Sequence, residues 1–128
     1  MPLVRIDVSR DLSDERVAAL ADAVHLALVD TVGVPKDDRF QIISKHDGNL
    51  LLIDREFPGV NRSNEALIIE ITFREGRSQD QKQRLYAEIV ERAAQTAGLR
   101  PADIMVVLHE NTFSDWSFGD GKAQYVEN

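Results

Sequence analysis

Apolar and polar residues alternate over residues 3–8, LVRIDV, and this period of two is typical of a half-buried strand. After Ser13 the period changes, because apolar residues recur every three or four positions up to Leu28. That pattern predicts an amphipathic helix of about five turns. Ser13 is a residue type that caps helix N-termini, and Gly33 is a type that ends helices. A second, short strand is expected at residues 40–44.

The same order of patterns begins again in the second half of the chain. Residues 66–73, ALIIEITF, form an almost continuous apolar run, which indicates a strand covered on both faces. Ser78 and Gln81 have the spacing of a capping box, and the apolar stripe that follows ends at Gly98. The last clear strand is predicted at residues 104–108. The segment between the halves is rich in turn residues.

The fold class expected from this repeat is α+β, with two β-α-β units in a single domain over residues 1–128. Right-handed crossovers place two helices on one face of about four strands. An apolar run at residues 50–53 is the candidate for an additional strand. The opposite face of the sheet is assigned the apolar residues of the third strand, Leu67, Ile69, Ile71 and Phe73. A solvated face would not hold so many, so a second sheet or another subunit is expected to cover it.

Composition and charge exclude several classes of protein. The 128 residues include no cysteine, so a disulfide framework, a thiolate metal site and a cysteine nucleophile are impossible. The net charge of −7 argues against nucleic acid as a partner, since phosphate contacts need clustered Lys and Arg. The apolar runs are too short for a membrane span, and the first residues do not resemble a secretory signal. A cytoplasmic protein without a membrane partner is expected.

Pro2 is the first candidate for chemistry. A small residue after the initiator Met normally allows removal of Met1, and removal would leave the Pro2 nitrogen as a free secondary amine. At the margin of an apolar face, desolvation lowers the pKa of an amine and a neighbouring carboxylate raises it, so the group could act as base or acid. The plain alternative is that Pro2 only begins a strand, where its missing N–H costs nothing.

Charged residues near two strand ends are further candidates. Arg74 and Arg77 lie between the third strand and the second helix, and two guanidinium groups beside a helix N-terminus favour a carboxylate or phosphate. The alternative is that they are solvated and pair with Glu75 or Asp80. Asp38 precedes the second strand and could orient a water or a substrate hydroxyl, although it could also be an ordinary turn residue.

The aromatic tail could form the wall of a small-ligand pocket, or it could anchor the chain end to the core or to another subunit. Its residues are Trp116, Phe118 and Tyr125. The three histidines lack the spacing of a metal pair, and no glycine-rich phosphate loop is present. We therefore expect neither a metal nor a nucleotide cofactor.

Together these features resemble the tautomerase superfamily, and within it the malonate semialdehyde decarboxylase family. The resemblance rests on Pro2 and on three segments, VPKDDRFQII at 34–43, REGRSQDQKQRLY at 74–86 and DWSFGDGKAQY at 115–125. It spans nearly the whole chain. The chain has one more residue between its two arginines than the family's usual Arg-x-Arg spacing.

The resemblance implies a role for each candidate residue. Pro2 would be the catalytic amine, and Asp38 would activate water or assist at the substrate carbonyl. The carboxylate of a small 3-oxo acid would be held by Arg74 and Arg77, and the aromatic pocket positions would be Trp116, Phe118 and Tyr125. It also implies a homotrimer with two helices packed on a four-stranded mixed sheet, in which the first and third strands are antiparallel neighbours.

The reaction that the resemblance implies is decarboxylation of malonate semialdehyde to acetaldehyde and carbon dioxide, without a cofactor. Keto–enol tautomerisation of a phenylpyruvate-type substrate, or hydration of an unsaturated three-carbon acid, would use the same residues. In a third hypothesis the chain is a non-catalytic ligand-binding domain in which Met1 is retained and blocks Pro2.

Overall fold

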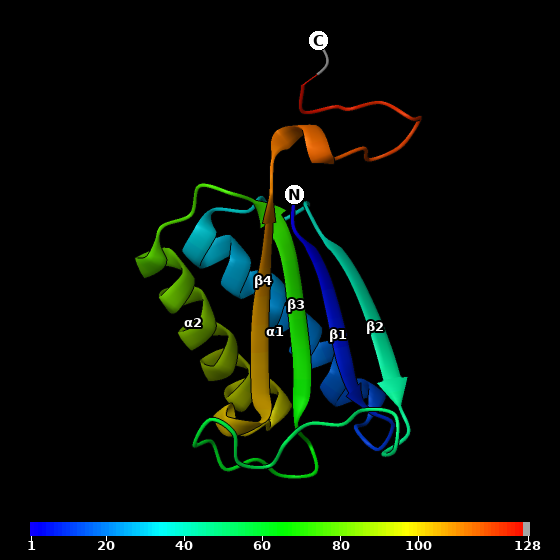
Figure 1. Cartoon of the computed structure of the whole chain (residues 1–128), viewed down its shortest axis with the longest axis vertical. Coiled ribbons are helices and arrows are strands. Elements are labelled where there is room, and N and C mark those ends of the chain that lie inside the picture. Colours follow the sequence, from blue (N-terminus) through cyan, green and yellow to red (C-terminus); the bar gives the residue numbers. More distant parts are fainter. Residues whose placement is uncertain (127–128) are drawn as a thin grey trace.

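The computed structural model describes residues 1–126, and its four strands form one sheet in the order β2-β1-β3-β4 (Figure 1). Strand β1 (Leu3–Ser9) pairs in parallel with β2 (Phe40–His46) and antiparallel with β3 (Leu67–Arg74). Strand β4 (Ile104–Asn111) pairs in parallel with β3. The sheet is therefore mixed, and the two predicted β-α-β units are confirmed as its halves.

Helices α1 (Asp14–Val32) and α2 (Gln79–Ala97) lie on one face of the sheet, as Figure 1 shows. Both predicted helix starts are confirmed. The Ser13 side chain accepts a hydrogen bond from the backbone N–H of Arg16, and Ser78 and Gln81 form the reciprocal capping box. Neither helix in the described part of the chain is long and apolar enough to cross a membrane.

The apolar core lies between the sheet and the helices, and β3 supplies some of its largest side chains: Leu67, Ile69, Ile71 and Phe73, each 0% exposed. The prediction that these side chains lie on the opposite face was wrong. The register pairs Val4 with Ile71 and Ile6 with Ile69, so β3 turns the same side to the helices as the buried residues of β1. The continuous apolar run hid this alternation.

The open face of the sheet carries a mixed set of side chains. In β3 these are Ile68, Glu70, Thr72 and Arg74, all only partly buried, so β3 is not equally covered on both faces as predicted. Other strands add more exposed apolar residues to the open face: Phe40, Ile42 and Met105 are 47, 42 and 41% exposed. The apolar excess on this face is therefore smaller than the sequence suggested.

The segment between β2 and β3 is an irregular loop, so the strand predicted at residues 50–53 is wrong. Leu50 and Leu52 are 67 and 84% exposed, and the segment joins no ladder of the sheet. Polar contacts fix the loop instead: the backbone N–H and the hydroxyl of Ser63 donate to the carboxylate of Asp103, which is completely buried. The apolar run pairs with neither outer strand of the sheet, β2 or β4, so local hydrophobicity alone did not make it a strand.

Candidate active site

The predicted site residues from both halves of the chain lie at one end of the strands. We call the two ends of the strands the two edges of the sheet. Because β1 and β2 are parallel to each other and β1 is antiparallel to β3, the starts of β1 and β2 share this edge with the ends of β3 and β4. In Figure 1 the N-terminus lies beside the head of the β3 arrow, and the tail after β4 extends beyond the same edge. The topology thus brings residues from the two ends of the chain together.

The N-terminal amine lies against Asp38 at this edge. The Met1 amine and an Asp38 carboxylate oxygen form an ion pair, and the two side chains are 12 and 18% exposed. Asp38 sits in a tight turn, in which its backbone N–H donates to the Pro35 carbonyl at 3.0 Å. Pro2 is buried where β1 begins, with its nitrogen still bonded to Met1. A carboxylate beside the terminal amine is the arrangement that proton transfer there requires.

Burial, followed by the charge of Arg77, lowers the pKa of the Met1 amine from 8.0 to about 6. Asp38 opposes this change, because a neighbouring anion favours the protonated amine. The pKa of Arg77 is itself lowered, first by burial and then by the positive charge of Arg74. The terminal amine and two guanidinium groups therefore act on one another in a partly desolvated place, and such an array favours an incoming anion.

Arg74 and Arg77 have no acidic partner within residues 1–126. The Arg77 Nη1 donates to the Arg74 carbonyl at 3.1 Å, and the Arg74 Nη1 donates to the Glu75 carbonyl at 3.3 Å. The Arg74 Nε is buried without a hydrogen-bond partner. A buried donor without a partner costs free energy, which a bound carboxylate would recover.

Within residues 1–126, no acidic side chain forms an ion pair with either arginine. Asp80 binds Arg84 at 3.2 Å, and Glu110, whose charge acts on Arg77, binds Lys82 at 2.7 Å. The alternative of arginines paired with Glu75 or Asp80 is therefore wrong. Gly76 has a φ of 117°, a region that favours glycine, and a Cβ there would stand 3.4 Å from the Arg74 Nη1.

The aromatic residues of the tail form a cluster beside the arginines. Phe118 stacks on Trp116 with ring centroids 5.6 Å apart and meets Tyr125 edge-on at 5.1 Å. Trp116 is held by its indole N–H, which donates to the Asn111 side chain at the end of β4 at 2.8 Å. The tail is thus anchored to the sheet, as one of the two interpretations expected, and its role as the wall of a ligand pocket stays a prediction.

Sequence reasoning missed two aromatic residues of this cluster. The Phe40 ring, at the start of β2, lies 5.8 Å from Phe118, and the Phe113 ring packs under the Arg74 guanidinium at 4.8 Å. Phe40 follows Asp38 by two residues and begins a strand, so parallel pairing with β1 could have placed it at this edge. Phe113 carried no comparable signal, because its position depends on how the tail folds back.

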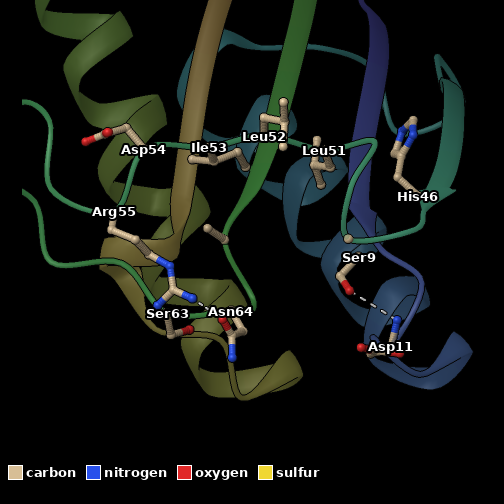
Figure 2. Close-up of a pocket in the computed structure, with 12 residues that line it drawn as sticks. Ser9, Asp11, His46, Leu51, Leu52, Ile53, Asp54, Arg55, Ser63 and Asn64 are labelled. Atoms are coloured by element: carbon tan, nitrogen blue, oxygen red, sulfur yellow. Dashed lines mark hydrogen bonds between the residues drawn. The ribbon is translucent and has the colours of Figure 1, made fainter.

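A hollow of about 590 Å³ lies at the opposite edge of the sheet, and no predicted site residue lines it (Figure 2). Strand ends and the loop after β2 form its wall, with Ser9, His46 and Arg55 among the lining residues. Figure 2 shows Arg55 bonded to the Asn64 side chain, so its guanidinium is already engaged. Among the residues that line the hollow, the arginine is therefore already hydrogen-bonded to a side chain, unlike the arginines at the other edge.

Comparison with known proteins agrees with this geometry. A family model described as "Tautomerase enzyme" matches residues 38–119, and a second model of the same description matches residues 2–54. "Probable tautomerase YusQ" and "Probable tautomerase YrdN", both from Bacillus subtilis (strain 168), are each 32% identical to the chain. The alignments cover 99 and 98% of this chain and 100 and 97% of those relatives. The chain belongs to the tautomerase family.

Solved structures give a finer comparison. A malonate semialdehyde decarboxylase inhibited by 3-bromopropiolate is 42% identical, with a TM-score of 0.91 over 97% of this chain and 94% of that one. A second malonate semialdehyde decarboxylase, described for its decarboxylase and hydratase activities, is 33% identical with a TM-score of 0.90 over 97 and 95%. The resemblance to this family inferred from the sequence is thereby confirmed.

Proposed function

We propose that the chain is a cofactor-independent decarboxylase that converts malonate semialdehyde, or a close 3-oxo acid, to an aldehyde and carbon dioxide. The observation that carries the proposal is a pair of arginines to which no acidic side chain of residues 1–126 is paired, near the terminal amine and Asp38. The likeness to two malonate semialdehyde decarboxylases supports this substrate class. With Met1 removed, the Pro2 amine would be the chain terminus next to Asp38.

Each part of the site has a role in the proposed reaction. Arg74 and Arg77 bind the carboxylate and hold the bond to be broken in line with the carbonyl π system. As that bond breaks, carbon dioxide leaves, and the electron pair of the broken bond moves toward the carbonyl, giving an enol or enamine. A protonated Pro2 amine stabilises this charge through a hydrogen bond, and a neutral amine first forms an iminium with loss of water. Protonation of the terminal carbon, with hydrolysis on the iminium route, gives acetaldehyde.

Asp38 and the aromatic wall complete the proposed site. Asp38 holds the amine and accepts or returns its proton during the reaction. Trp116, Phe118 and Tyr125 exclude water and limit the size of the substrate, with Phe40 and Phe113 behind them. A dry pocket strengthens the interaction of the guanidinium groups with the substrate carboxylate.

Keto–enol tautomerisation is the second candidate function. It is favoured by the surroundings of the chain terminus, where burial and the charge of Arg77 lower the pKa of the Met1 amine. The same influences would favour a neutral Pro2 amine once Met1 is removed, and a neutral amine can accept a proton from carbon. Two relatives described as probable tautomerases point the same way. Hydration of an unsaturated three-carbon acid would use the same arginines to bind the carboxylate, and one of the related decarboxylases is described as having a hydratase activity.

We further propose that the chain works as a homotrimer. A fused 4-OT protein described as a symmetric trimer shares the fold, with a TM-score of 0.78 at 17% identity. Large side chains on the open face of the sheet, including Phe40, Ile42 and Met105, are exposed in the single chain. Sedimentation equilibrium should give three times the 14.4 kDa chain mass, and a monomer would contradict this assembly.

The experiment that separates the candidate reactions uses protein whose mass proves that Met1 is absent. Incubation with malonate semialdehyde should release acetaldehyde and carbon dioxide in equal amounts, faster than phenylpyruvate enol is converted to its keto form. Faster conversion of the enol, with no acetaldehyde, would establish the tautomerase instead. Borohydride added during turnover should attach the substrate carbons to Pro2 only if the iminium forms.

A further inference from the structure

His25 is a buried histidine on α1 that the proposed reaction does not use. Its side chain lies on the buried face of the helix, and the residue is only 6% exposed. Asp103 is the other buried polar residue in the described chain, and its carboxylate is accounted for by two hydrogen bonds from Ser63. Burying a histidine costs free energy unless its ring nitrogens form hydrogen bonds. The hydrogen-bond partner of His25 therefore indicates its role.

The His25 ring bonds to the loop that carries Asp38. Its Nε2 lies 2.8 Å from the backbone carbonyl oxygen of Lys36, two residues before Asp38. A carbonyl can only accept, so Nε2 must carry the proton and donate it. Both the neutral Nε2–H tautomer and the protonated ring satisfy this bond.

The other hydrogen bonds and ion pairs between this loop and α1 lie at the two ends of the loop. At the start, the Val34 N–H donates to the Leu28 carbonyl of α1 at 3.4 Å. At the end, Arg39 pairs with Asp22 of α1 at 2.8 Å. Between these contacts, the bond from His25 ties the backbone directly before Asp38 to the helix.

We propose that His25 is a positioning residue, whose bond to the Lys36 carbonyl fixes the turn that holds Asp38 beside the N-terminal amine. The proposal rests on the catalytic role given above to Asp38. A displacement of about 1 Å of a catalytic group can cost about a hundredfold in rate. A loop without regular structure needs such a tie if its carboxylate is to stay within reach of the amine.

Two substitutions separate the hydrogen bond from the packing. His25→Leu replaces the ring with an apolar side chain of similar bulk and removes the donor. His25→Gln keeps an N–H donor at a similar distance from the backbone. Ser63→Ala is the matched control, because it removes a buried hydrogen bond to Asp103 in the opposite part of the fold. Thermal unfolding of all three variants reports their stability separately from the site.

Two readouts test the proposal in protein that lacks Met1. In His25→Leu we expect kcat for malonate semialdehyde to fall about tenfold while KM changes less than about twofold, since the arginines that bind the carboxylate are untouched. We also expect the pKa of the Pro2 amine, followed by NMR titration, to fall, because the carboxylate that favours its protonated form is less well held. His25→Gln should recover both values, and Ser63→Ala should lose stability alone.

The proposal is overturned if His25→Leu folds with the kcat and the amine pKa of the parent protein. It is also overturned if a folded His25→Gln behaves as His25→Leu does. The NMR titration needs no turnover, so it tests His25 even if malonate semialdehyde is not a substrate. Failure of the proposed reaction would instead appear as absent turnover in the parent protein, whatever the variants do.

Discussion

Arg74 and Arg16 lie near opposite edges of the same sheet, and their surroundings differ sharply. Arg16, at the start of α1, donates to both oxygens of Glu65 and to the carbonyls of Ala97 and Gly98. It therefore joins the start of one helix to the end of the other. Arg74 makes one long hydrogen bond to a neighbouring carbonyl and leaves its Nε buried without a partner.

The contrast extends to the two edges as a whole. Near Arg16, charged and polar groups are paired within the chain, including Arg10 with Asp47 at 2.6 Å. Near Arg74, the positive charge of Arg74 acts on Arg77, and that of Arg77 acts on the terminal amine. The hollow of about 590 Å³ lies at the paired edge, whereas the unpaired cations lie at the other. We therefore place the candidate site by its unpaired cations and not by the size of a hollow.

The largest difference between the two edges is expected when each arginine is replaced in turn. We expect Arg74→Ala and Arg77→Ala to lower kcat/KM for malonate semialdehyde by about a hundredfold or more, because each removes a charge-assisted contact to the substrate. Arg16→Ala should instead lower the free energy of unfolding, by about 1–3 kcal/mol, and leave turnover per folded molecule unchanged. Steady-state kinetics and urea unfolding measure the two effects. Equal kinetic losses at both edges would contradict the comparison.

Asp103 tests the structural role of the paired edge. Asp103→Ala leaves the Ser63 N–H and hydroxyl without their acceptor, so the free energy of unfolding should fall by about 2–3 kcal/mol. Chemical denaturation measures this loss, and kcat of the folded fraction should match that of the parent protein. A large fall in kcat at full folding would show that the two edges are functionally coupled.

The effect of the arginine charges on the terminal amine can be measured in protein that retains Met1. Arg77 disfavours the protonated amine, so Arg77→Gln should raise the pKa of that amine from about 6 toward its usual 8.0. Arg16→Gln, near the opposite edge, should leave the pKa unchanged. NMR titration of the amine measures both values. A pKa that stays near 6 in Arg77→Gln would mean that burial alone lowers it.

The smallest expected effect concerns the tail. Trp116→Phe keeps an aromatic ring for Phe118 to stack on, but loses the hydrogen bond from the indole N–H to Asn111. The loss of about 1 kcal/mol should raise KM about fivefold with little change in kcat. An unchanged KM would remove the tail from the substrate pocket and leave it only the anchoring role.

Much of the fold could be predicted from the sequence because its signals are local. The caps of both helices depend on Ser and Gly at defined positions, and the period of two in β1 shows directly which side is buried. In β3 this signal failed, since Ile68 interrupts the alternation and only pairing with β1 decides which side faces the helices. The prediction of a strand at residues 50–53 was wrong for a related reason, because local hydrophobicity does not show whether a segment will pair with a strand of the sheet.

For the candidate site, too, the sequence indicated residues near strand ends but not contacts that depend on the path of a loop or tail. Pro2, Asp38 and the two arginines could be named from the chain because each adjoins a strand end, and the topology then brings them to one edge. The packing of Phe113 under Arg74 could not be predicted, since it depends on the path of an irregular tail. The ion pair of the Met1 amine with Asp38 was missed as well, because it joins the chain terminus to a loop that follows α1.

The central claim is that the terminal amine at the unpaired edge carries out the chemistry. Its most direct test compares the same chain with and without Met1, each form verified by intact mass, in the release of acetaldehyde from malonate semialdehyde. The protein without Met1 should turn over at least about a hundredfold faster, since only its Pro2 amine is free. Equal rates for the two forms would contradict the account.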